Sequence, residues 1–422
     1  MKFTWDRNTE ITAADIPELT KEILFSGGFD KPIGHNILPE SLKSIEFGKH
    51  FNQPIRENVL PNSLISIDFG WKFNQQIGEN VLPNSLKTIE FGRYFNQPIR
   101  ENVLPNFLIS IDFGWKFNQQ IGENVLPNSL MSIDFGWKFN QQIGENVLPN
   151  SLKTIEFERY FNQPIGENVL PNSLETIEFG HDFNQPIGLN VLPNSLKVLK
   201  FGFYFNQPIG ENVLPNSLKT INFDCGFNHP IGENVLPNSL ETIKFGCLFN
   251  HQIGVNVLPD HLEYIRFGCG FNQPIGENVL PGSIKRVEIG EQYGHYDSIY
   301  NHSISALYNL NYIESILLYT ENYIEIDVDR LPPSLKYLLT SNEDIVLSLN
   351  PESQRMWFSV VMLDLQFPLD ITYPMLVHSS YPRYDDGVYE VIGTETVDGE
   401  KYDKLINLAH YQPRSNAKSA RK

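Results

Sequence analysis

The chain has 422 residues, of which 41% are hydrophobic, and its formal net charge is −18 at pH 7. This composition excludes a disordered chain, and the acidic balance argues against nucleic acid as a partner, because phosphates are repelled. The N-terminal residues lack an apolar signal segment, and no apolar run approaches the roughly 20 residues that span a bilayer. Only three cysteines occur, so no disulfide framework is expected. These features predict a cytoplasmic protein without membrane contact.

Residues 1–28 are expected to form an N-terminal cap with a half coil. Ile16-Pro17-Glu18 and Ile23 lie 22 residues before Leu38-Pro39-Glu40 and Ile45, which belong to the first regular copy of a longer pattern. The pattern therefore begins in a degenerate form before the regular repeats.

Residues 29–292 contain twelve regular copies of a 22-residue unit. The pair Phe-Asn recurs at every twenty-second position from Phe51 to Phe271, and Phe29-Asp30 begins the same pattern one step earlier. A fixed step of this size, without insertion or deletion, is typical of a leucine-rich-repeat solenoid.

Each copy is expected to contain one short strand and irregular backbone. In one copy Ile133 and Phe135 alternate with Ser132 and Asp134, which is the pattern of a strand with one buried face. Pro149 argues against a helix in the rest of the unit. The chain is therefore predicted to be mainly β, a leucine-rich-repeat-like solenoid of 22-residue coils with one parallel sheet.

Two columns of asparagine recur in the copies, one from Asn52 to Asn272 and the other from Asn58 to Asn278. Buried turns need partners for their peptide groups, and an amide side chain both donates and accepts hydrogen bonds. We expect both columns to link neighbouring turns rather than to bind a ligand.

The pattern degenerates towards the C-terminus. Residues 293–345 are expected to form two degenerate repeats, with about seven residues inserted near Tyr293–Ile299. Residues 346–411 are expected to form a small β or α+β cap, or else a separate recognition module, with a hairpin around Asp398-Gly399. Residues 412–422 are expected to be a basic, disordered tail.

The segments Phe161-Asn162-Gln163-Pro164-Ile165 and Leu170-Pro171-Asn172-Ser173-Leu174 closely resemble the FNIP repeat family. The resemblance implies a leucine-rich-repeat-like fold and an origin in amoebae or in the large DNA viruses that infect them, hence host cytoplasm for a viral protein. Some members of that family carry an F-box, which implies a substrate adaptor with ubiquitin-ligase components as partners.

The outward strand positions form a line of carboxylates that has two interpretations. It is either a solvated face, whose repulsion is offset by Lys72, Arg93, Lys116, Lys138 and Arg159, or a concave strip that binds a protein partner. The candidate partner-binding residues of the strip are Asp68, Trp71, Glu90, Tyr94, Asp112, Trp115, Asp134, Trp137, Glu156, Tyr160 and Glu178.

No catalytic residues, cofactor or metal site are predicted, because a repeat supplies identical groups in lines and an active site needs unlike groups that converge. A straight line of carboxylates also does not surround an ion. Cys225, Cys247 and Cys269, with His229 and His251, leave open zinc binding, a disulfide between neighbouring coils, or simple packing. The preferred function is a non-enzymatic protein-interaction scaffold. The alternatives are an adaptor or decoy for a ubiquitin ligase and a purely structural rod.

Overall fold

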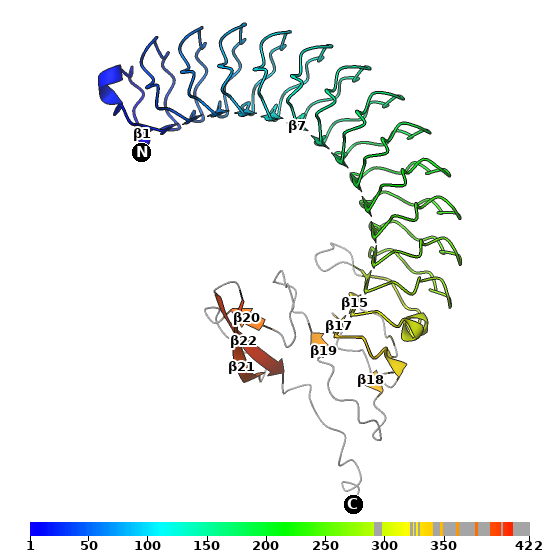
Figure 1. Cartoon of the computed structure of the whole chain (residues 1–422). Helices are drawn as coiled ribbons and strands as arrows, with labels where there is room; N and C mark the ends of the chain where they lie inside the picture. Colours follow the sequence, from blue (N-terminus) through cyan, green and yellow to red (C-terminus); the bar gives the residue numbers. More distant parts are fainter. Residues whose placement is uncertain are drawn as a thin grey trace, which may run out of the picture.

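The computed structural model is a curved solenoid whose strands line the inner, concave edge of an arc (Figure 1). It describes residues 1–290, 298–320, 324, 326–327 and 330–340, and strands at 347–348, 360–362, 376–378, 389–397 and 400–407. The strands from successive coils form a single parallel sheet of 17 strands. The predicted fold class, a leucine-rich-repeat-like solenoid with one parallel sheet, is confirmed.

The strands of this sheet are β1 (Lys2–Trp5), β2 (Glu22–Phe25), β3 (Ser44–Glu46), β4 (Ser66–Asp68), β5 (Thr88–Glu90), β6 (Ser110–Asp112), β7 (Ser132–Asp134), β8 (Thr154–Glu156), β9 (Thr176–Glu178), β10 (Val198–Lys200), β11 (Thr220–Asn222), β12 (Thr242–Lys244), β13 (Tyr264–Phe267), β14 (Arg286–Ile289), β15 (Ser315–Leu318), β17 (Tyr337–Thr340) and β19 (Val360–Met362). Two 3₁₀ turns, η1 (Ala13–Asp15) and η2 (Ser305–Asn309), lie near the two ends of this sheet.

The register of the sheet follows the sequence period. Ile45 pairs with Ile67 and Ile67 with Ile89, a step of 22 residues. The step is 29 residues between β14 and β15, where Val287 pairs with Ile316, and it returns to 22 between β15 and β17. Residues 1–28 contribute two strands, β1 and β2, which pair with each other in parallel.

Two smaller sheets lie in the C-terminal part of the described chain. β16 (Ile326–Asp327) pairs in parallel with β18 (Leu347–Ser348). β22 (Glu400–Asn407) pairs antiparallel with both β20 (Leu376–His378) and β21 (Tyr389–Val397). Val397 lies opposite Glu400, as expected for a hairpin, although Asp398-Gly399 and the tail at 412–422 lie outside the described residues.

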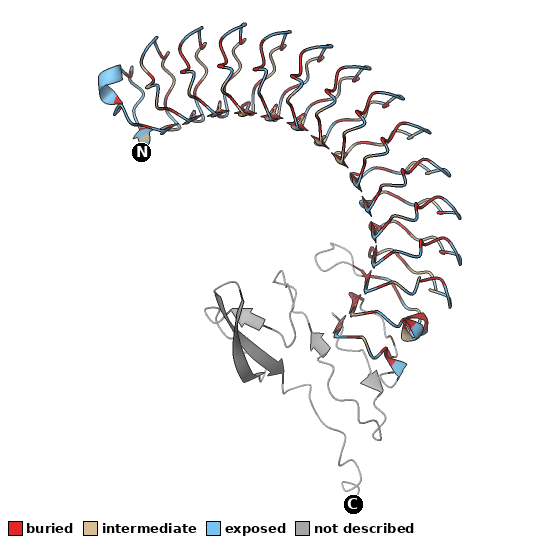
Figure 2. Cartoon of the chain, in the orientation of Figure 1, coloured by how far each residue is buried: buried red, intermediate tan, exposed pale blue. Residues whose placement is uncertain are grey.

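The core consists of apolar columns, which recur as buried positions on every coil (Figure 2). Phe51 and Phe73 are each at most 1% exposed, and their ring centres lie 6.1 Å apart with planes 4° from parallel. A second phenylalanine from each coil packs against the first, as Phe69 does against Phe73 at 4.2 Å. One coil alone cannot bury these rings, so the stack itself supplies the hydrophobic stabilisation.

The first asparagine column links the coils as expected. The Asn52 side-chain oxygen accepts a hydrogen bond from the Asn74 backbone N–H at 2.9 Å and another from the Gln75 amide at 3.1 Å. The same pair of bonds recurs in coil after coil, for example on Asn74 and Asn96. The ladder therefore satisfies backbone groups that the short strands leave unpaired.

The second asparagine column has a different role from the one predicted. These residues are exposed, and their φ angles lie between 57° and 64°, as at Asn58 and Asn102. Left-handed backbone is costly for most residues with a side chain, but asparagine tolerates it. This column therefore sets the direction of a turn and does not link coils from a buried position.

Candidate functional site

A groove follows the concave face of the sheet through its first half, from Thr4 to Glu158, and has a volume of about 780 Å³. Its lining combines strand carboxylates with the tryptophans that follow the strands. Of the predicted strip, it contains Asp68, Trp71, Glu90, Asp112, Trp115 and Trp137. Glu46, Lys49, Arg93 and Glu158 also line it, and sequence reasoning did not include these four among the site residues.

We call Glu46, Asp68, Glu90, Asp112, Asp134, Glu156 and Glu178 the carboxylate row. Each pairs in register with the next along the sheet. Burial raises the pKa of Asp68, Glu90 and Asp112, and nearby carboxylates add to the rise at Asp68 and Glu90. The Asp68 side chain accepts a hydrogen bond from the Gly70 backbone N–H at 2.7 Å, which opposes the rise there. The row is thus charged, crowded and only partly hydrated.

The cations beside the row contact aromatic rings, and this differs from the expectation that they neutralise the carboxylates. The Arg93 guanidinium lies 3.5 Å from the Trp115 ring centre, and the Lys116 ammonium lies 4.2 Å from that of Tyr94. Within the described residues, the first ion pair that a member of the row makes is Glu178 with Lys200, at 2.7 Å. The faces of electron-rich rings attract these cations.

The result is a continuous cation–aromatic column along one edge of the groove, formed by Lys49, Trp71, Arg93, Trp115, Trp137 and Arg159. Lys49 lies 4.6 Å from the Trp71 ring centre, and the rings of Trp115 and Trp137 are 4.8 Å apart. Trp71 nevertheless remains 46% exposed. The column presents flat apolar surface to the groove without losing its positive charges.

Other members of the predicted strip lie outside the groove lining. Tyr94 and Tyr160 stand one position further along the chain than the column and are 41% and 37% exposed. Glu156 is exposed and Glu178 is half-buried, on the strands β8 and β9. The groove lining therefore brings together the tryptophans and the first carboxylates of the predicted strip, and the two tyrosines lie outside it.

Glu158 breaks a column of glycines and forms a carboxylate cluster with Asp134 and Glu156. One side-chain oxygen from each lies within 4.8 Å of the others, the one such group of possible metal ligands in the described part of the chain. Burial, with the charges of Asp112, Glu156 and Glu158, raises the pKa of Asp134 to about 7. Carboxylates from two columns therefore converge here, and the sequence signal was the loss of the glycine that stands at Gly136 and Gly180.

The opposite end of the strands, outside the groove lining, carries a feature that sequence reasoning missed. We call the residues directly before each strand the pre-strand column. In the first half it contains Ile65, Ile109 and Met131, which are 42%, 39% and 45% exposed, and Phe107 nearby is 59% exposed. The Met131 backbone N–H donates to the Ile109 carbonyl oxygen at 2.8 Å, which keeps these side chains adjacent. The signal was Phe107 and the aliphatic residues in place of the serine and lysine of other copies.

The pre-strand column is charged in the second half of the solenoid. Glu175 bonds both Lys153 and Lys197, at 2.9 and 2.6 Å. Glu263 similarly bonds Lys285 at 2.7 Å. Opposite charges thus neutralise one another where the first half exposes aliphatic side chains.

The cysteines and histidines belong to separate columns. The ring nitrogens of His229 and His251 each lie 3.1 Å from an asparagine carbonyl oxygen, where other coils use glutamine. None of the three cysteines is in a disulfide, and burial, together with a hydrogen bond to Cys247, raises the pKa of the Cys225 thiol to about 12. Cysteine and histidine do not come together as a set of metal ligands among the described residues.

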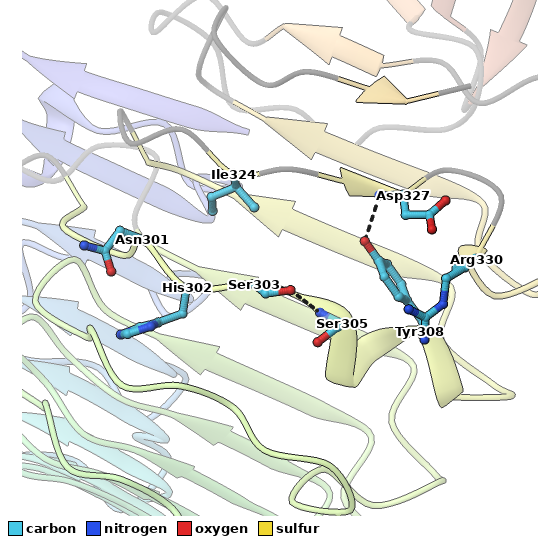
Figure 3. A pocket seen from close by; sticks show the side chains of 8 residues that line it. All are labelled: Asn301, His302, Ser303, Ser305, Tyr308, Ile324, Asp327 and Arg330. Atoms are coloured by element: carbon cyan, nitrogen blue, oxygen red, sulfur yellow. Dashed lines mark hydrogen bonds between the residues drawn. The ribbon is translucent and has the colours of Figure 1, made fainter. Parts of the chain in front are cut away.

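A second hollow of about 420 Å³ lies beside η2 (Figure 3). The Tyr308 hydroxyl accepts a hydrogen bond from the Asp327 backbone N–H at 2.9 Å, and the Arg330 guanidinium lies 5.1 Å from the tyrosine ring centre. Its other lining residues are Asn301, His302, Ser303, Ser305 and Ile324. In the described residues the two helical turns are three and five residues long, and no helix is able to cross a membrane.

Comparison with known proteins agrees with this architecture. The model of the FNIP Repeat matches residues 8–50, 51–94, 95–138, 139–182, 183–226 and 227–270, which together exceed half of the chain. A solved structure described as CroV588, "a novel circular LRR protein structure", is 47% identical, with a TM-score of 0.71 over 84% of this chain. The match covers 53% of that protein, so this chain spans about half its length.

A mouse RP105/MD-1 complex structure is 10% identical, with a TM-score of 0.37 over 79% of this chain and 76% of its own. That similarity is too low to support an argument. A search of curated proteins finds no match.

Proposed function

The chain belongs to the FNIP repeat family, and on that premise we propose that it is a non-enzymatic scaffold that binds a protein partner in the groove on its concave face. The observation that carries the proposal is the exposed tryptophan surface beside the carboxylate row. Trp71 is 46% exposed although it lies in a groove, and Trp115 and Trp137 continue the same surface. Tryptophan and arginine in concave, partly desolvated positions are the residues that anchor protein interfaces.

A scaffold is favoured over an enzyme because the groove repeats the same groups in lines. Asp68, Glu90 and Asp112 occupy equivalent positions on successive strands. Catalysis instead needs unlike groups that converge on one reacting atom. None of the three cysteines is in a disulfide, which suits a reducing compartment, so we place the protein in the cytoplasm.

The test is a comparison of proteins recovered from native or host cytosol with the full chain as bait. The variant Trp71→Ala/Trp115→Ala/Trp137→Ala is expected to recover at least about tenfold less of the specific partner than the wild type does, since each anchor contributes about 1 kcal/mol or more to binding. The matched control is Phe203→Ala/Tyr204→Ala, which removes rings that are 40% and 55% exposed outside the groove and should retain the partner.

Recovery of the same proteins by the wild type and the tryptophan variant would contradict the proposal. Ligase components among the specific partners would identify the chain as a substrate adaptor or decoy of a ubiquitin ligase. Failure to recover any specific partner would favour a purely structural rod.

A further inference from the structure

We infer that the occupant of the groove is an extended segment of a partner protein with lysine or arginine at alternate positions. The segment lies along the solenoid axis, with its cations over the carboxylate row. Its apolar surface contacts the tryptophans on one side of the row and the pre-strand column on the other. This inference rests on the proposed function and deepens it by stating the chemistry of the partner.

The charge of the groove supports a cationic occupant. Asp68, Glu90 and Asp112 make no ion pair in the described part of the chain, although they are adjacent and Asp68 and Asp112 are half-buried. The nearest cations of the groove wall, such as Arg93, contact tryptophan rings instead. A ligand that supplies positive charge therefore relieves repulsion that the protein itself leaves in place, whereas an anionic ligand increases it.

The spacing of the row suits an extended segment that crosses the strands. Neighbouring strands lie about 4.8 Å apart, so the five strands from Asp68 to Glu156 cover roughly 19 Å. An extended chain rises about 3.3 Å per residue, so roughly six residues span the same length and place three side chains on one face. Lysine or arginine at alternate positions thus distributes three cations over five carboxylates.

The two sides of the carboxylate row suit the stems of the same side chains. Trp71 and Trp115 offer ring surface in the groove lining after the strands, and Ile109 and Met131, outside that lining, offer exposed aliphatic surface before the strands. The methylene stems of lysine and arginine pack on apolar surface while their charged ends contact carboxylates. A small hydrated cation would contact the carboxylates but neither of the apolar surfaces beside them, so this face as a whole favours a polypeptide.

The test uses the full chain and two synthetic peptides, acetyl-(Lys-Ser)₄-amide and acetyl-(Glu-Ser)₄-amide. Binding is measured by calorimetry and by the fluorescence of the groove tryptophans. We expect the lysine peptide to bind and to change the fluorescence, with affinity that falls as salt is raised, and the glutamate peptide not to bind. Equal binding of both peptides, or of neither, would overturn the inference.

Matched variants separate the groove from the general acidity of the chain. The variant Asp68→Asn/Glu90→Gln/Asp112→Asn is expected to bind the lysine peptide with at least tenfold lower affinity. Glu175→Gln/Glu241→Gln/Glu263→Gln removes the same number of carboxylates from the pre-strand column and should change affinity less than twofold. Equal weakening in both variants would show non-specific attraction and reject the site. Thermal unfolding confirms that each variant is folded.

The outcomes also separate this inference from the proposed function. If the tryptophan variant loses its cytosolic partner but the lysine peptide does not bind, the inference fails and the scaffold remains. If the peptide binds as expected but the tryptophan variant keeps every partner, the proposed function fails.

Discussion

The two halves of the sheet share a backbone and a core but differ in what they present to the concave side. From β3 to β8 the outward positions are carboxylates without ion pairs in the described residues, flanked by tryptophans and exposed aliphatic residues. From β10 to β13 the same positions hold Lys200, Asn222, Lys244 and Arg266, and the pre-strand column is neutralised by ion pairs between opposite charges. The comparison teaches that buried columns determine the fold, while surface chemistry varies independently on the same frame.

The core should respond equally to truncation in either half, and this is the largest effect expected. Phe95 and Phe227 are each 1% exposed, with neighbouring rings of their column at 6.0–6.2 Å. Phe95→Ala and Phe227→Ala should each lower the free energy of unfolding by about 3–5 kcal/mol, measured by urea denaturation. A difference of more than about 2 kcal/mol between the variants would show that the halves do not share one core.

The carboxylate cluster gives the first half a pH dependence of its own. Because the folded-state pKa of Asp134, about 7, lies above its ordinary value of 3.8, the protonated side chain is favoured in the folded protein. Its stabilising contribution is complete below pH 4 and is lost as the pH rises through 7. Asp134→Asn should therefore raise the unfolding temperature by about 1–3 °C at pH 8.

At pH 3 the same substitution should have little effect on the unfolding temperature, because both states of the wild type are then largely protonated at Asp134. Glu145→Gln, at an exposed position away from the groove, is the control and should be neutral at both pH values. An equal gain from Asp134→Asn at both pH values would contradict the assigned pKa.

The pre-strand column should tolerate exchange between the two halves with the smallest effect on stability. Ile65→Glu places a carboxylate between Lys43 and Lys87, which repeats the arrangement of Glu175 between Lys153 and Lys197. The free energy of unfolding should change by less than about 0.5 kcal/mol, because exposed ion pairs contribute little. Thermal unfolding measures this, with Glu175→Ile as the reverse exchange. Destabilisation above about 1 kcal/mol would mean that Ile65 packs as a core residue.

The fold was predictable because every copy repeats the same buried positions. The 22-residue step from Phe51 onward predicted the sheet, its register and the amide ladder. The turn role of Asn58 was not predictable from its spacing, because two asparagine columns with equal periods look alike until one is seen to adopt positive φ.

The candidate site was predictable only as a set of columns. Sequence places Arg93 near both carboxylates and tryptophans, but only the side-chain conformation shows that it contacts the Trp115 ring. The groove ends at Glu158 because of how side chains from several columns pack around it. The sequence of any one column does not contain that information. Glu158 itself was visible in the sequence, because it and Asp224 are the two charged residues in a column of glycines.

The amide ladder has a consequence for how such a protein can evolve. Asn74 donates a hydrogen bond to Asn52 in the same way that Asn96 donates one to Asn74. Each coil therefore offers the next one the same hydrogen-bonding surface that it uses itself. Recombination that removes or adds the coding sequence of a whole repeat therefore leaves the hydrogen bonds between neighbouring coils intact. The length of the arc, and with it the reach of its binding surface, is free to change in a single genetic event.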